Sequence, residues 1–128
     1  MLKFLIIAGG GAVGALLRYI VSGIAYKYSY VFFPFGTLAV NLIGSFSIGF
    51  LWEISERIFI APDIRLFLFI GVIGAFTTFS TYGLETFNLF RDGEIKFAIL
   101  NILISNILGI ALVFIGFITS KFLFNIIH

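Results

Sequence analysis

The chain has 128 residues, of which 61% are hydrophobic and 11% charged, and its formal net charge is +2. Soluble domains carry about 25% charged residues, so this composition excludes an ordinary water-soluble domain and indicates one membrane-embedded domain over residues 1–128. The chain has no cysteine and its one histidine is His128. A disulfide framework, a histidine-based metal or catalytic centre and an enzyme active site are therefore not expected, and the small charge gives no reason to expect nucleic acid.

Four apolar stretches of spanning length are separated by short polar segments. A transmembrane helix needs about 20 predominantly apolar residues. Stretches near this length run approximately over residues 4–26, 35–52, 66–90 and 97–124. The sequence therefore predicts an all-α membrane protein with four transmembrane helices.

The first stretch contains a glycine motif and one positively charged residue, Arg18. Residues 9–14 read G-G-G-A-V-G, which matches the G-x-G-x-x-G of dinucleotide-binding folds. Those folds need an acidic residue about 20 positions on, and residues 29–36 contain none, so no nucleotide is expected. Instead, Gly10 and Gly14 are expected to let another helix approach closely. Arg18 either pairs inside the protein or reaches the membrane interface with its long side chain.

Polar and small residues recur at helical spacing in the second and fourth stretches. They are Thr37, Asn41, Gly44 and Ser45 in the second stretch, and Asn101, Ser105, Asn106 and Gly109 in the fourth. Such stripes either join helices through hydrogen bonds or present uncharged donors to a polar ligand.

The third stretch contains an unusual concentration of hydroxyl groups. Residues 71–85 read G-V-I-G-A-F-T-T-F-S-T-Y-G-L-E. Non-helical backbone at membrane depth is tolerated only where protein or a water-filled cavity satisfies its polar groups. We therefore expect a helix broken in mid-membrane that handles something polar. The hydroxyl residues are Thr77, Thr78, Ser80 and Thr81, and the aromatic residues are Phe76, Phe79 and Tyr82.

Two properties of the third stretch bear on its ligand. The positive edge of an aromatic ring attracts anions weakly, and conduction requires binding that is weak enough for release. Phe79, Tyr82, Asn41 and the threonines therefore form a reasonable path for a small anion. Glu85 is the one acid within a span, and it either couples transport to protons or pairs with a cation.

The basic residues are balanced between the two ends of the predicted bundle. A strong positive bias fixes the orientation of a membrane protein. The absence of one fits insertion in both orientations, although a weak bias is the other explanation. The end with the N-terminus carries Lys3, Arg57, Arg65 and Lys121, and the other end carries Lys27, Arg91 and Lys96, with Arg18 as a possible fourth.

Three motifs together resemble the CrcB/Fluc family of fluoride channels over essentially the whole chain. They are Gly10-x-x-x-Gly14-x-x-x-Arg18, Gly36-Thr37-Leu38-x-Val40-Asn41-x-x-Gly44, and Gly71-x-x-Gly74-x-x-Thr77-Thr78-Phe79-Ser80-Thr81-Tyr82 followed by Glu85. The third motif is specific, whereas the glycine spacing of the first is weak by itself.

The resemblance implies an antiparallel, dual-topology homodimer in the cell inner membrane. Such channels export fluoride passively through two pores and relieve fluoride toxicity. A structural sodium ion would bind backbone carbonyls of Gly74 and Thr77 at the dimer centre. The matching pore-lining residues are Phe79, Tyr82, Asn41, Ser105 and Thr37, with Arg18 and Glu85 at the places of recurrent charged residues, beside the hydroxyls of Thr78, Ser80 and Thr81.

This chain departs from the family pattern at Tyr82, where the family has phenylalanine, and at Gly109 and Val113, where hydroxyls are usual. Two other classes of protein remain as alternatives. A proton-coupled small multidrug exporter would need an essential acid, ideally in the first span, and only Glu85 is available. A structural protein without transport activity would have no need for the hydroxyl-rich segment.

Overall fold

The computed structural model describes residues 1–29 and 33–128, and every regular element in these ranges is helical. In chain order the elements are α1 (Leu2–Lys27), α2 (Phe35–Arg57), α3 (Pro62–Arg65), the π-helical η1 (Leu66–Ile73), α4 (Gly74–Phe76), α5 (Phe79–Arg91) and α6 (Ile95–Ile127). Four segments are long and apolar enough to cross a membrane, with residues 62–91 forming the third. The prediction of four spans is confirmed.

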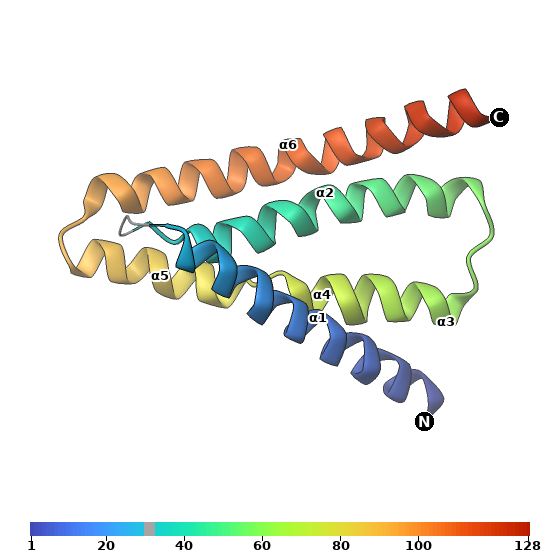
Figure 1. Cartoon of the computed structure of the whole chain (residues 1–128), viewed down its shortest axis with the longest axis horizontal. Coiled ribbons are helices and arrows are strands. Elements are labelled where there is room, and N and C mark those ends of the chain that lie inside the picture. The colour runs from blue at the N-terminus through green and yellow to red at the C-terminus, as the bar shows by residue number, and fades with distance from the viewer. Residues whose placement is uncertain (30–32) are drawn as a thin grey trace.

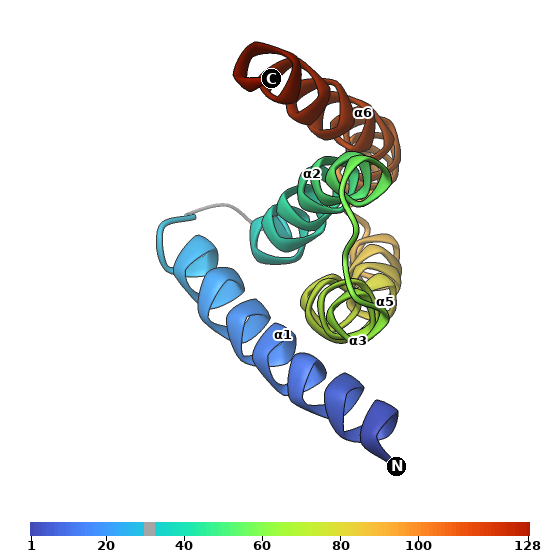
Figure 2. The same ribbon diagram turned by 90° about the vertical axis from the view of Figure 1, so that its right-hand side faces the viewer.

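The helices run up and down between two ends of the molecule. Both termini and the α2–α3 connection lie at one end, and the α5–α6 turn lies at the other (Figure 1). The helices α2 and α6 therefore run in the same direction side by side. A second view shows α1 crossing the others at an angle, outside the group formed by α2, α5 and α6 (Figure 2).

The third span is interrupted at Thr77 and Thr78, between α4 and α5. Thr77 has φ −84° and ψ 158°, and Thr78 has φ −149° and ψ 115°. Both residues are thus extended, which ends one helix and starts another near the middle of the span (Figure 1). The predicted helix break is confirmed.

Glycines allow close contact between helix backbones. A methyl group on Gly10 would lie 2.5 Å from the carbonyl oxygen of Phe67 and 2.9 Å from the Cα atom of Gly71. Gly14 similarly faces the backbone of Val72. The expectation that Gly10 and Gly14 admit another helix is confirmed, and the helix in question is η1 with α4.

The helix α2 extends past its predicted end at residue 52 to Arg57. Side-chain pairs four positions apart support helices, and two such pairs occupy this last stretch. The indole nitrogen of Trp52 donates to Glu56 over 2.9 Å, and Arg57 forms an ion pair with Glu53. Apolar content alone could not predict this polar continuation.

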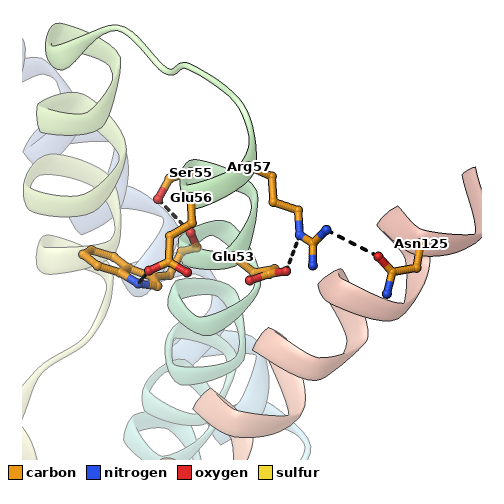
Figure 3. A network of polar contacts seen from close by, with 6 residues as sticks. Glu53, Ser55, Glu56, Arg57 and Asn125 are labelled. Carbon is orange, nitrogen blue, oxygen red and sulfur yellow. Dashed lines mark hydrogen bonds and ion pairs between the residues drawn. The ribbon is translucent and has the colours of Figure 1, made fainter. Parts of the chain in front are cut away.

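A polar network joins the ends of α2 and α6 (Figure 3). Glu53 is only 4% exposed and accepts a hydrogen bond from Arg57 Nε. Arg57 also donates from Nη1 to the side-chain oxygen of Asn125 over 3.3 Å and lies over the Phe124 ring. The buried carboxylate is therefore paired, and its partner also contacts α6.

Few large apolar side chains are buried within the chain, and many are exposed. Leu38, Val40, Ile73, Phe76 and Leu89 are among the buried ones. In contrast, Phe79 is 81% exposed and Phe87 59% exposed. So much exposed apolar surface requires an apolar environment, in agreement with a multi-pass membrane protein.

Candidate functional site

The break in the third span is held by the side chain of Asn41 on α2. Its Nδ2 donates to the carbonyl oxygen of Thr78 over 3.0 Å, and its Oδ1 accepts from the Thr78 N–H over 2.8 Å. Buried peptide groups outside regular structure need such partners. Asn41 therefore satisfies both polar atoms of the extended residue and fixes the break against α2.

Thr78 also starts the second half of the broken helix. It occupies the N-cap position of α5, where its hydroxyl accepts a hydrogen bond from the Thr81 N–H over 3.2 Å. The same hydroxyl donates to Thr81 Oγ1 over 3.0 Å and lies 3.3 Å from Ser80 Oγ. Threonine is a favourable N-cap residue, so this hydroxyl cluster explains why α5 begins at Phe79.

These contacts leave two backbone carbonyls without their helical donors. In a continuous helix the Thr78 N–H would donate to Gly74, but it donates to Asn41 instead. Likewise the Thr81 N–H, which would donate to Thr77, donates to Thr78 Oγ1. Carbonyl oxygens are ligands for hard cations. These are the two carbonyl groups for which the resemblance to fluoride channels implied a sodium ion, and that ion stays a prediction.

Acidic and histidine side chains offer no comparable metal site in residues 1–29 and 33–128, since no group of three lies together.

A groove of about 290 Å³ lies beside the break, between α2, α5 and α6. The rings of Phe79 and Tyr82 lie on one side, with centroids 5.4 Å apart and planes at 50°. The polar side chains that line it include Asn41, Ser45, Thr77, Ser105 and Asn106. The structure thus brings together four of the five residues expected to line a pore: Phe79, Tyr82, Asn41 and Ser105.

A directed chain of hydrogen bonds runs from this groove into the interior. The Ser105 hydroxyl donates to Asn101 Oδ1 over 3.2 Å, and Asn101 Nδ2 donates to Thr86 Oγ1 over 2.9 Å. Thr86 in turn donates to the carbonyl oxygen of Tyr82 over 2.8 Å. Asn101 is only 2% exposed, so this chain joins α5 and α6 through a buried amide.

The fifth expected pore residue, Thr37, lies elsewhere. Its hydroxyl donates to Glu85 Oε1 over 2.8 Å, and the Tyr26 hydroxyl donates to the same oxygen over 2.6 Å. These residues line a second cavity of about 340 Å³ that also includes Arg18. Thr78 lines both cavities, so the helix break lies between them.

Glu85 is only partly satisfied. Its Oε2 atom is buried and has no hydrogen-bond partner within the described residues. Arg18 forms no ion pair among the described residues, although it lines the same cavity as Glu85. The geometry therefore places the two charged residues in one cavity, on the opposite side of Thr78 from the aromatic groove.

Sequence reasoning missed Tyr26 and Thr86. Thr86 follows Tyr82 by one helical turn, so its place on the α6-facing side of α5 was available from helical periodicity. Tyr26 lies at the end of α1, and nothing in the sequence relates it to Glu85 across 59 positions.

The chain is similar to known proteins over most of its length. Residues 5–117 match the family model described as CrcB-like protein, Camphor Resistance (CrcB). A protein of Parabacteroides distasonis named fluoride-specific ion channel FluC is 49% identical over 121 residues, which cover 94% of each chain. The identically named protein of Salinibacter ruber is 47% identical over 116 residues, or 91% of this chain and 87% of the relative.

A third relative, from Desulforapulum autotrophicum, has the same name and is 42% identical over 120 residues, or 93% of this chain and 96% of its own. These names describe ion channels and not enzymes, in agreement with the expectation that the chain has no catalytic site. The family match covers nearly the whole chain, including the broken third span and the helices that contact it. The protein therefore belongs to the CrcB-like family.

Proposed function

We propose that this protein is a fluoride-selective channel that carries fluoride passively out of the cell and so relieves fluoride toxicity. The observation that carries the proposal is the groove at the helix break, where amide and hydroxyl groups face the rings of Phe79 and Tyr82. The names of the relatives from Parabacteroides and Salinibacter support fluoride as the ion.

The chemistry of the groove suits a small anion that must bind and leave. None of the described residues lining it is lysine or arginine, so no fixed cation holds the anion tightly. Uncharged donors and ring edges can replace part of its hydration shell. Because each contact is weak, release remains fast enough for conduction.

We further propose that two antiparallel copies form the working channel, with two pores at their interface. A groove open along one side cannot enclose an ion, and Phe79 beside it is 81% exposed. A second copy, turned upside down, would cover this surface and create two equivalent paths by symmetry. The balanced basic residues at the two ends of the bundle support insertion in both orientations.

A sodium ion is proposed at the centre of this dimer. Each copy would contribute the carbonyl oxygens of Gly74 and Thr77, which have lost their helical donors. A bound cation would satisfy these oxygens in a region without water. Replacing sodium with N-methylglucamine should lower the thermal stability of the purified dimer; unchanged stability would remove the ion from the proposal.

The proposed function is tested by ion efflux from liposomes that contain the purified protein. Fluoride and chloride electrodes should record fast fluoride release without chloride release. Phe79→Leu should reduce the fluoride rate by about tenfold, equivalent to about 1.4 kcal/mol in the barrier. Phe87→Leu is the matched control, because Phe87 lies on the same helix, is also exposed and does not line the groove.

Absence of fluoride release from folded protein would overturn the fluoride channel. Proton-coupled efflux of organic cations that depends on Glu85 would then support the exporter class. Equal loss of flux in the Phe79 and Phe87 variants would leave fluoride transport in place but remove Phe79 from the path.

A further inference from the structure

The hydroxyl group of Tyr82 has a partner that fixes its hydrogen-bonding role. Asn106 Nδ2 on α6 lies 3.2 Å from Tyr82 Oη and 2.8 Å from the carbonyl oxygen of Ile102. An amide nitrogen has two hydrogens and no acceptor site, so one hydrogen serves each oxygen. Bonding to the Ile102 carbonyl anchors the amide to its own helix, and the second hydrogen is directed at Tyr82.

It follows that Tyr82 is an acceptor in this contact. Its own O–H hydrogen remains uncommitted, since no acceptor for it lies within hydrogen-bond distance among residues 1–29 and 33–128. A hydroxyl that accepts a hydrogen bond becomes a stronger donor through polarisation. The Tyr82 hydroxyl is thus prepared to donate to whatever occupies the groove.

The serine expected in the same path has the opposite arrangement. Ser105 donates to Asn101 Oδ1, and a carbonyl-type oxygen can only accept. The Ser105 hydrogen is therefore committed inward, along the chain to Thr86. Facing the groove, Ser105 offers only lone pairs, which repel an anion unless the bond to Asn101 breaks.

The other hydroxyl groups that line the groove either donate their hydrogen within the protein, as Ser105 does, or have no amide that holds their oxygen. Thr77 Oγ1 donates to the Ile73 carbonyl over 3.1 Å. Ser45 lines the groove and has no hydrogen bond from its side chain within the described residues, but no amide holds it in place either. Tyr82 differs from them because its oxygen accepts a hydrogen bond from Asn106, while its hydrogen has no acceptor within the described residues.

We propose that Asn106 is a positioning residue that holds Tyr82 so that the phenol O–H donates to the anion in the groove. The proposal rests on the proposed fluoride channel, and it assigns to the tyrosine hydroxyl of this chain a role that a phenylalanine could not have. Asn106 acts only through Tyr82, whereas Tyr82 touches the anion.

The test is a double-mutant cycle measured by fluoride efflux from liposomes at fluoride concentrations below saturation. Tyr82→Phe and Asn106→Leu should each slow fluoride efflux about tenfold. The first change removes the hydrogen bond from the phenol to the anion, and the second leaves the phenol without the amide that directs it. In the Tyr82→Phe background, Asn106→Leu should have no further effect. Tyr28→Phe is the control variant, because it removes the same hydroxyl from an exposed tyrosine that does not line the groove, and it should leave the rate close to that of the unaltered protein.

Two results would overturn the proposal. One is an unchanged rate in Tyr82→Phe. The other is an equal effect of Asn106→Leu with and without the Tyr82 hydroxyl, because Asn106 would then act through the structure of α6.

A spectroscopic measurement separates this proposal from the proposed function. The Raman doublet of tyrosine distinguishes a phenol that accepts a hydrogen bond from one that also donates, and the Tyr82 signal is obtained by difference against Tyr82→Phe. Without fluoride, the signal should be that of an acceptor and should change in Asn106→Leu. Adding sodium fluoride, but not sodium chloride, should convert it to that of an acceptor and donor.

If the unaltered protein releases no fluoride, the proposed function fails, while the response of the doublet to Asn106→Leu still decides whether Asn106 positions Tyr82. If fluoride is released but the Raman doublet of Tyr82 changes neither in Asn106→Leu nor on addition of fluoride, only the proposal for Asn106 and Tyr82 fails.

Discussion

At the scale of single residues, the side chain of Asn41 makes the two hydrogen bonds to Thr78 that a neighbouring backbone would make in a sheet. Within residues 1–29 and 33–128, one of its two amide hydrogens is used, so the second can serve a ligand in the groove. Holding the break also deprives Gly74 of the Thr78 N–H, which links Asn41 to the proposed sodium site.

Asn41→Leu should therefore lower stability and weaken the response to sodium. Two backbone groups of Thr78 would lose their partners, and each unsatisfied buried group costs about 1–3 kcal/mol. The Thr78 N–H would be free to return to the Gly74 carbonyl, which competes with sodium for that oxygen. Thermal unfolding in detergent, measured in sodium and in N-methylglucamine salts, should show both effects.

Ser45→Ala is a suitable control for this change, because Ser45 lines the same groove and is not among the described hydrogen-bond partners of Thr78. It should unfold like the unaltered protein and keep its sodium dependence. Normal stability of Asn41→Leu would contradict the role of Asn41 in holding the helix break. A normal response to sodium would show that sodium binding does not depend on the contact between Asn41 and Thr78.

At the scale of helices, packing depends on the absence of side chains at a few positions. Gly10 and Gly14 bring α1 against the backbone of η1 and the Ala75 side chain of α4, and van der Waals contact is the main attraction between helices in lipid. Gly11 is adjacent in sequence, but a methyl group there would meet nothing within 4 Å. The three-glycine run therefore combines contact and non-contact positions.

Gly14→Ala should destabilise the protein, whereas Gly11→Ala should not. A methyl group on Gly14 would lie 2.9 Å from the carbonyl carbon of Val72 and 3.1 Å from Ala75 Cβ, and the backbone cannot move away cheaply. Overpacking of this kind costs about 1–3 kcal/mol. Thermal unfolding of the two variants in parallel measures the difference; equal midpoints would show that α1 tolerates displacement.

The sequence predicted the helices well because the membrane imposes a simple rule on their length and composition. It also predicted the break, since four hydroxyl residues next to glycines conflict with a plain lipid-facing helix. Asn41, Phe79, Tyr82 and Ser105 line one groove, and the resemblance to fluoride channels had implied that they share a path.

The placement of Thr37 could not be predicted in the same way. Thr37 and Asn41 are one turn apart on α2, yet Thr37 bonds to Glu85 and Asn41 to Thr78. Which cavity a side chain enters depends on how α2 is rotated against α1 and α5, and periodicity within one helix carries no information about that rotation. The contact between Tyr26 and Glu85 could not be predicted for the same reason.

At the scale of the whole molecule, the balance of charges and the exposed apolar surface support the same proposal. In the proposed channel, a second copy in the opposite orientation would cover the groove that one copy leaves open. Chains of a single orientation could not supply such a pair. Orientation in the membrane is therefore a property on which the proposed channel depends.

Dual topology predicts that the C-terminus is found on both sides of the membrane. The chain has no cysteine, so His128→Cys introduces a single site for a membrane-impermeant maleimide. In intact spheroplasts about half of the chains should be labelled, because the positive residues give little preference for either orientation. Complete labelling, or none, would show one orientation and contradict the antiparallel pair.

Adding charge to one end should abolish this balance. Ser29→Lys with Asp92→Lys raises the basic residues beside the α5–α6 turn from three to five, against four at the end with the termini. The more positive end stays in the cytoplasm, so the C-terminal label should become accessible on nearly every chain. Fluoride flux should fall together with the loss of mixed orientations, and it should recover when a second chain with charges biased the opposite way is co-expressed. Flux that persists in chains of one orientation would contradict the antiparallel channel.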